Sequence, residues 1–311
     1  MQRRGVTTTL AFVLASVCVV FSAGCMDLDG FVYNARHCSV LTESDCTEVP
    51  EGWDVDWDLL CVPCEEPYDW SKDYNWVDGM LADGEDIRPV DNATVVNDRI
   101  ETEDGLGELD IYYIPSHGED PTKADTTILY SHGNFANIEH YQPRVRLLHE
   151  AGYHVIVWDY RGYGKSEPAQ TATSEQFLSD AIQVQQWALT QAPDASKIVL
   201  YGISLGAIPA IEMATRGTQP CALFLEVPFT SMNQIAEANT GASLGEGFLS
   251  QGNYNNRGKL EGYRDPLLVM HGSNDNLFPL DDVKELYDGA IGPKEMWIVE
   301  GGEHGIGKGV P

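Results

Sequence analysis

A chain of 311 residues, 43% of them hydrophobic, is long enough to bury one full core, because single α/β domains often run to about 250 residues. We therefore expect one large domain with a small appendage. The formal net charge of −29 argues against polyanionic partners such as nucleic acid or anionic lipid headgroups.

The N-terminus has the pattern of an export signal. Arg3 and Arg4 precede an apolar run from 10 to 21, and small residues then lead to Cys25, which predicts a signal peptide over 1–24. Small residues directly before a cysteine resemble a bacterial lipobox, and this predicts a lipid anchor on Cys25 and a membrane-anchored lipoprotein of the bacterial cell envelope. Ser22 stands where that pattern usually has Leu, so an ordinary secretory signal and an uncleaved anchor helix remain alternatives.

Residues 25–90 form a predicted acidic, cysteine-rich N-terminal segment. Four cysteines lie within 27 residues of it: Cys38, Cys46, Cys61 and Cys64. In an exported chain this density predicts two disulfides, with three connectivities that remain open, while a zinc site or a redox pair is the alternative. Cys221 opens an apolar stretch, and we expect it to be a buried, unreactive thiol.

The negative charge is concentrated before the main domain. Between 26 and 127 there are 27 acidic and 5 basic residues. The series Asp54, Asp56, Asp58 resembles a calcium-binding loop, but Leu59 stands where the sharp turn of such a loop needs glycine. We therefore interpret these carboxylates as a solvated acidic face.

From about 94 onward, apolar runs alternate with amphipathic stretches in a βαβ rhythm. Unbroken apolar runs such as TTILYS (126–131) and HVIVW (154–158) are typical of parallel strands that are buried on both faces. The remaining predicted strands are 94–101, 108–115, 197–203, 222–227, 266–270 and 295–299, and the predicted helices are 138–151, 173–191, 205–215 and 280–290. Together they predict an α/β fold with a mostly parallel sheet of about eight strands and helices on both faces.

The segment Gly202-Ile203-Ser204-Leu205-Gly206 lies between a predicted buried strand and a predicted helix. This is the context of the G-x-S-x-G turn that exposes a nucleophilic serine. A serine hydroxyl needs a base, itself oriented by a carboxylate, and parallel sheets gather such groups at the carboxyl ends of their strands. Two later strand ends provide Asp275 and His304, so we predict Ser204 as nucleophile, His304 as base and Asp275 as the orienting acid.

Four segments make the chain from about 94 to 305 resemble the α/β-hydrolase superfamily. They are HGNFAN (132–137), DYRGYGKS (159–166), GISLG (202–206) and the pair HGSNDNLFP (271–279) with GGEHG (301–305). The resemblance is to capless members related to depalmitoylating thioesterases and serine-aminopeptidase-like proteins, and it implies a hydrolase domain over 91–311. It also implies an oxyanion hole formed by the backbone amides of Asn134 and Leu205, with Phe135 as the alternative to Asn134.

Other polar residues at strand ends compete for these roles. His132 and His271 each precede a glycine, which favours a structural role. Asp159 occupies a position that braces loops in this family, and Glu226 lies within its strand. About 35 residues connect Phe229 and Asp265, too few for a large helical lid.

These residues predict a serine hydrolase that cleaves a carboxylic ester or thioester through a covalent acyl-enzyme. The substrate would be a small-molecule or acylated compound, and no metal or organic cofactor is implied. An aminopeptidase-like amide hydrolase and a non-catalytic binding lipoprotein remain alternatives. The chain ends seven residues after His304, without the terminal helix usual in the family, so we expect the histidine loop to be less braced.

Overall fold

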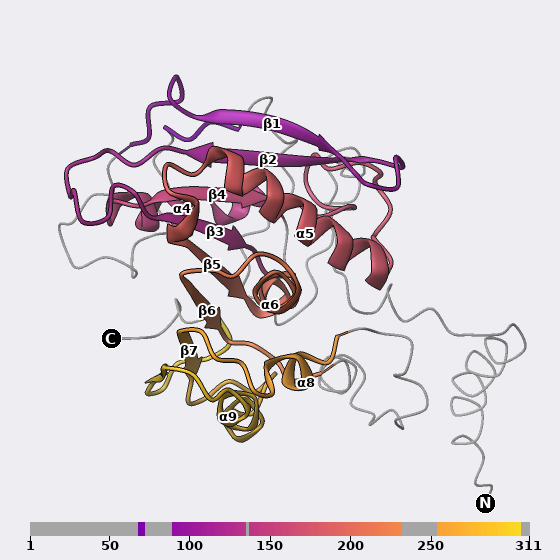
Figure 1. Ribbon diagram of the computed structural model, residues 1–311, viewed down its shortest axis with the longest axis vertical. Coiled ribbons are helices and arrows are strands. Elements are labelled where there is room, and N and C mark those ends of the chain that lie inside the picture. Colours follow the sequence, from indigo (N-terminus) through magenta and orange to yellow (C-terminus); the bar gives the residue numbers. More distant parts are fainter. Residues whose placement is uncertain (1–67, 72–88, 135–136, 232–253, 306–311) are drawn as a thin grey trace, which may run out of the picture.

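The computed structural model describes residues 68–71, 89–134, 137–231 and 254–305 (Figure 1). The predicted signal peptide, Cys25 and the four clustered cysteines lie outside the described residues, as do Phe135 and most of the connection after Phe229. Within the described part of the chain, no helix has both the length and the apolar character needed to cross a membrane.

The described strands form one eight-stranded sheet in the order β1-β2-β4-β3-β5-β6-β7-β8. The pairs β1–β2 and β2–β4 are antiparallel, and every other neighbouring pair is parallel. The strands are β1 (Val96–Glu101), β2 (Glu108–Ile114), β3 (Thr127–Ser131), β4 (His154–Trp158), β5 (Ile198–Ile203), β6 (Ala222–Glu226), β7 (Leu267–Gly272) and β8 (Lys294–Val299). The predicted mostly parallel sheet of about eight strands is therefore confirmed.

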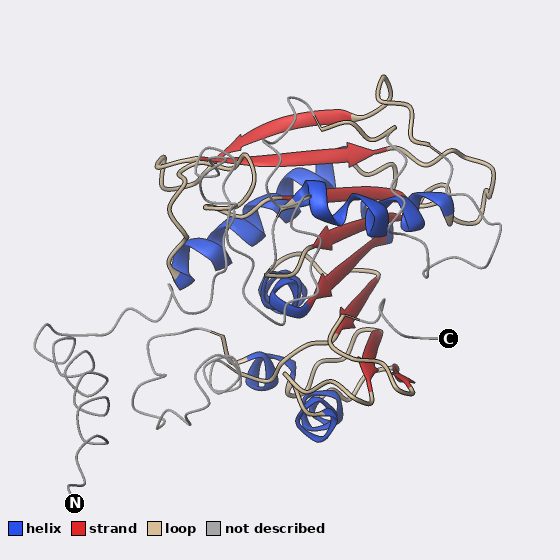
Figure 2. Ribbon diagram, turned by 180° about the vertical axis from the view of Figure 1, so that it is seen from behind, coloured by secondary structure: helices blue, strands red, loops and turns tan. Residues whose placement is uncertain are grey.

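Helices lie on both faces of this sheet (Figures 1 and 2). They are α4 (Ile138–Glu150), α5 (Ser174–Gln191), α6 (Ala207–Arg216), α8 (Asn256–Leu260) and α9 (Leu280–Gly289). Side chains of α5, α6 and α9 belong to the hydrophobic cluster that contains Ile156 of β4. Side chains of α4 belong to a second cluster, which contains Val155 and Val157 of the same strand. Because successive side chains of a strand point to opposite faces, the strands separate these two cores.

Two predicted boundaries differ from the structure. A 3₁₀ turn over Ser204–Gly206 precedes α6, which begins at Ala207 and not at Leu205. Strand β7 continues through Gly272, so His271 lies inside the strand and is fully buried. The short helix α8 was not predicted, because its five residues are too few for an amphipathic period to show.

The prediction that Cys221 is buried is wrong. Cys221 is a free, exposed cysteine. It lies one residue before β6, where its amide donates to the carbonyl of Ile198 at 2.7 Å. The apolar run suggested a core position, but the side chain lies at the rim of the sheet, before the two-sided burial of the strand begins.

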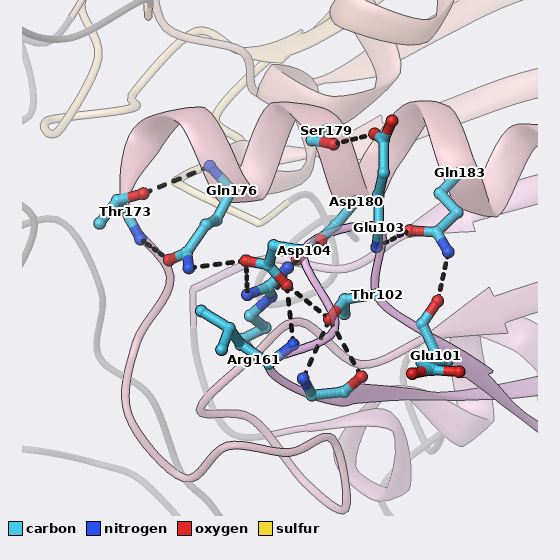
Figure 3. A network of polar contacts seen from close by, with 12 residues as sticks. Glu101, Thr102, Glu103, Asp104, Arg161, Thr173, Gln176, Ser179, Asp180 and Gln183 are labelled. Carbon is cyan, nitrogen blue, oxygen red and sulfur yellow. Dashed lines mark hydrogen bonds and ion pairs between the residues drawn. The ribbon is translucent and has the colours of Figure 1, made fainter.

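The turn between β1 and β2 is fastened to α5 through Arg161 (Figure 3). The guanidinium of Arg161 donates to both carboxylate oxygens of Asp180, at 2.8 and 2.7 Å, and to Asp104 Oδ2 at 2.7 Å. Gln176 of α5 also donates to Asp104, at 2.9 Å. The antiparallel edge of the sheet is thereby joined to the helical layer.

Candidate active site

The backbone at Ser204 places its hydroxyl at the carboxyl end of β5. Ser204 has φ +50°, in the left-handed region that a residue with a side chain rarely adopts, and this marks a tight strand-to-helix turn. A Cβ atom added at Gly202 would collide with the carbonyl of Gly206, and one at Gly206 would collide with the carbonyl of Ser131. Both glycines of the G-x-S-x-G segment are therefore required by close backbone packing.

The structure brings the three predicted side chains into one hydrogen-bonded series. His304 Nε2 lies 3.0 Å from Ser204 Oγ, and His304 Nδ1 lies 2.8 Å from Asp275 Oδ2. A carboxylate only accepts, so Nδ1 carries the proton, and in the neutral ring Nε2 is left to accept from the serine hydroxyl. The His304 side chain is 24% exposed and Asp275 is fully buried, so solvent reaches the histidine but not the carboxylate.

The environment of Asp275 favours its ionised form. Burial by itself would raise the pKa of Asp275, but the hydrogen bond from His304, with that from the amide of Phe278, holds this pKa below its usual value. Asp275 Oδ1 accepts from the amides of Leu277 and Phe278 at 2.8 and 2.9 Å. The carboxylate is thus fixed in charge and in orientation.

Hydrogen bonds also join the loop after β7, which carries Asp275, to the loop after β8, which carries His304. The amide of Asn274 donates to the carbonyl of Gly302 at 2.8 Å, and the amide of Gly301 donates to Ser273 Oγ at 2.8 Å. The ring of Phe278 meets that of His304 edge-on, with centroids 5.0 Å apart. These contacts hold the histidine loop from the side of β7.

His271 was expected to be structural, and its contacts are those of a buried support. Its Nε2 donates to the carbonyl of Phe278 at 2.8 Å and lies 3.6 Å from Asp275 Oδ2. Burial lowers the pKa of His271, which keeps the ring neutral beside the acid.

The competing residues lie in other interactions. His132 Nε2 is 3.2 Å from Asp159 Oδ1, and both side chains are fully buried. Glu226 accepts from Arg144 Nη1 at 2.8 Å and from the Tyr201 hydroxyl at 2.6 Å. These contacts occupy both carboxylates away from His304, and Asp275 is the acid that the fold places beside the histidine.

The predicted oxyanion loop follows β3 and lies beside the serine turn. A Cβ atom at Gly206 would stand 2.7 Å from the carbonyl oxygen of His132, and one at Gly133 would stand 3.8 Å from that of Ile203. Asn134 and Leu205 therefore belong to two backbone segments in close contact. The side chain of Asn134 accepts a hydrogen bond from the Tyr163 hydroxyl at 2.5 Å, a contact that no pattern in the sequence indicated.

A groove on the helical side of the molecule is separate from these three residues. A groove of about 730 Å³ lies along α5 and α6, and its lining includes Leu178, Ile182 and Lys259 but no residue of the series. We do not assign it to the substrate of Ser204. No group of three or more His, Cys, Asp or Glu side chains within the described ranges could hold a metal ion.

Known proteins resemble this chain in sequence and in fold. Residues 122–251 match the family described as serine aminopeptidase, S33. The uncharacterized protein YfhR of Escherichia coli K12 is 31% identical over 198 residues, which is 62% of this chain and 68% of YfhR. The lysophosphatidylserine lipase ABHD12 of Danio rerio is 30% identical over 193 residues, 54% of this chain and 48% of that protein.

Among solved structures, the esterase Pf2001 of Pyrococcus furiosus superimposes with a TM-score of 0.56. It is 24% identical, and the alignment covers 68% of this chain and 83% of the esterase. At that identity the likeness concerns the fold.

Proposed function

Because this chain belongs to the α/β-hydrolase superfamily, we propose that it is a serine hydrolase that cleaves carboxylic esters or thioesters with Ser204, His304 and Asp275. The observation that carries the proposal is the series Ser204 Oγ to His304 Nε2 at 3.0 Å and His304 Nδ1 to Asp275 Oδ2 at 2.8 Å. The Ser204 turn, at φ +50°, supports it further.

The reaction begins when Ser204 Oγ attacks the acyl carbonyl and its proton passes to His304 Nε2. Asp275 holds the Nδ1–H and stabilises the imidazolium that forms, without taking a proton. The amides of Asn134 and Leu205 donate to the oxyanion. Leu205 lies in the 3₁₀ turn that leads into α6, whose N-terminal dipole favours negative charge.

In the second half of the cycle, the proton on His304 goes to the leaving alcohol or thiol, and Ser204 keeps the acyl group as an ester. Water then enters, His304 takes its proton, and the second tetrahedral intermediate collapses to release the acid and restore Ser204. The 24% exposure of the His304 side chain leaves room for water to approach.

The test is covalent labelling of the purified protein with a fluorophosphonate probe, together with hydrolysis of p-nitrophenyl acyl esters. We expect one label per wild-type molecule and none on Ser204→Ala, whose hydrolysis should fall by at least about 10³-fold. Ser179→Ala, which changes a partly buried serine of α5 that bonds to Glu103, is the matched control and should label like wild type. A folded wild-type protein that neither labels nor hydrolyses any ester would overturn the proposal in favour of a binding protein.

The substrate class rests on similarity and needs its own experiment. The lipase and esterase among the similar proteins favour an ester, whereas the matched family description names an aminopeptidase. We expect acyl esters and thioesters to be cleaved faster than aminoacyl p-nitroanilides. The opposite ranking of kcat/KM would make the chain an amide hydrolase with the same three residues.

We further propose that the protein is exported and anchored to the cell envelope through Cys25. The support is the charged, apolar and small-residue pattern of residues 1–25. A Cys25→Ser variant is expected to move from the membrane fraction to the soluble fraction of the cell envelope. If this variant remains with the membrane, the lipid anchor is refuted.

A further inference from the structure

Residues 159–164 brace the loop that we assign to the oxyanion hole. Asp159 Oδ1 lies 3.2 Å from His132 Nε2, and the Tyr160 hydroxyl donates to the carbonyl of His132 at 2.6 Å. The Tyr163 hydroxyl donates to Asn134 Oδ1 at 2.5 Å. Three side chains of one short segment therefore contact two residues of the other.

The conformation of this segment turns Tyr163 inward. The residues on either side of it, Gly162 and Gly164, have φ of +83° and +49°, a region that favours glycine. A Cβ atom on Gly164 would collide with Asp159 Oδ2. Tyr163 itself is fully buried, and its ring lies 5.4 Å from the His132 ring and 5.3 Å from that of Tyr160.

The braced loop is the one that contacts the serine turn. A Cβ atom on Gly206 would collide with the carbonyl of Ser131 and would come within 2.7 Å of that of His132. Asn134 follows two residues later, with its side chain held by Tyr163. A change in the position of Asn134 therefore changes the position of its backbone amide relative to Ser204.

We infer that Tyr163 is a positioning residue for the oxyanion hole: its hydroxyl holds the Asn134 side chain, so that the Asn134 amide faces the oxyanion formed at Ser204. This inference rests on the proposed function. Tyr163 touches no reacting atom, and it acts only through Asn134. Because an oxyanion donor must meet charge that exists only in the transition state, loss of the bond should lower kcat and leave KM nearly unchanged.

The experiment compares Tyr163→Phe, Asn134→Ala and the double variant, with a p-nitrophenyl ester as substrate. Tyr163→Phe keeps the buried ring and removes the hydroxyl, while Asn134→Ala keeps the backbone amide and removes the acceptor. We expect each single variant to lower kcat by about 10- to 100-fold with KM within about twofold. The double variant should be no slower than the slower single variant, because both changes break the same bond.

Tyr287→Phe is the matched control. Its hydroxyl donates to the carbonyl of Lys294 at 3.2 Å, away from Ser204, and kcat should match wild type. A wild-type kcat in Tyr163→Phe, or effects of the two single variants that multiply, would overturn the inference. If Tyr163→Phe does not fold, Asn134→Ala becomes the test of the inference. A wild-type kcat in Asn134→Ala would then overturn the inference.

The failure of this inference is distinguishable from failure of the proposed function. If wild type is neither labelled by fluorophosphonate nor active on esters, the proposed function fails. If wild type is labelled and active but the variants match it, only the role of Tyr163 fails.

Discussion

The two oxygens of the Asp275 carboxylate have separate tasks. Oδ2 accepts from His304 Nδ1, and Oδ1 accepts from the amides of Leu277 and Phe278. An asparagine could keep the second set of contacts, but its amide nitrogen cannot accept from Nδ1–H. The orientation of the loop and the tautomer of the histidine therefore depend on different atoms of one side chain.

Asp275→Asn should lower kcat by about 10⁴-fold without unfolding the protein, because it favours the wrong tautomer of His304 and loses the charge that stabilises the imidazolium. The measurement is steady-state ester hydrolysis, with circular dichroism to monitor the fold. Asp265→Asn is a matched control, since Asp265 accepts a solvent-exposed hydrogen bond from Gln219. A loss of less than about tenfold in Asp275→Asn would remove Asp275 from the proposed series.

Some of these residues could be found from the sequence and others could not. Ser204 and Asp275 follow the largely buried parallel strands β5 and β7, and His304 follows the half-exposed border strand β8. Because the strand ends of one sheet converge, the strand pattern predicted that the three residues would meet. The hydrogen bond between Tyr163 and Asn134 joins two loops that meet only in the folded protein. The spacing of residues along the sequence therefore does not predict it. The exposure of Cys221 was missed for a related reason: an apolar run locates a strand, but not the residue at which burial begins.

At the scale of elements, Arg161 joins the β1–β2 hairpin to α5, because it donates to Asp104 in the hairpin turn and forms a buried ion pair with Asp180 of the helix. Arg161 and Asp180 are 2% and 1% exposed, and the guanidinium meets both carboxylate oxygens. Breaking such a pair leaves an uncompensated charge in the protein interior, which is far more costly than the loss of an exposed pair.

Arg161→Gln is accordingly expected to lower the free energy of unfolding by about 3 to 5 kcal/mol. Arg257→Gln is the matched control, because Arg257 and Glu285 are 59% and 56% exposed, and we expect a change of less than about 1 kcal/mol. Urea denaturation followed by circular dichroism measures both. Equal stabilities of the two variants would show that the buried contacts of Arg161 contribute no more stability than an exposed ion pair.

Parallel strands were the most predictable elements because burial on both faces leaves continuous apolar runs, as in β3 and β4. The hairpin was also predictable, since Asp104-Gly105 separates two strand-like stretches and Gly105 has φ +65°. Its attachment to α5 was not predicted. Arg161 lies in a segment whose sequence indicates a turn, and its partners are 57 and 19 positions away.

At the scale of the whole molecule, one buried acid should make stability depend on pH. Burial raises the pKa of Asp110 to about 6, while a hydrogen bond from Asn97 at 2.9 Å only partly offsets it. An unfolded aspartate titrates near 3.9, so between about pH 4 and 6 the folded state binds more protons than the unfolded state. Over this range the contribution of Asp110 to the free energy of unfolding falls as pH rises.

Asp110→Asn should therefore reduce the difference in free energy of unfolding between pH 4.5 and pH 7.5, by up to about 2 kcal/mol. Urea melts at the two pH values measure it. Asp98→Asn is the control, because it removes one negative charge from an exposed position of β1. We expect this variant to keep the wild-type difference between the two pH values. If Asp110→Asn keeps the wild-type difference, Asp110 is not the group that titrates.

Strand β8 lies at the border of the sheet, and the proposed base His304 follows it. Among the described strands, β8 pairs only with β7. His304 is 100 positions after Ser204 in the sequence. A nascent chain that has emerged only as far as Val299 would carry its nucleophile without its base. As the denaturant concentration rises, local unfolding of this border strand should abolish ester hydrolysis before the rest of the sheet unfolds. The rate of ester hydrolysis would then report the pairing of β8 with β7. Circular dichroism of the whole protein would not resolve this step, because it averages over all strands.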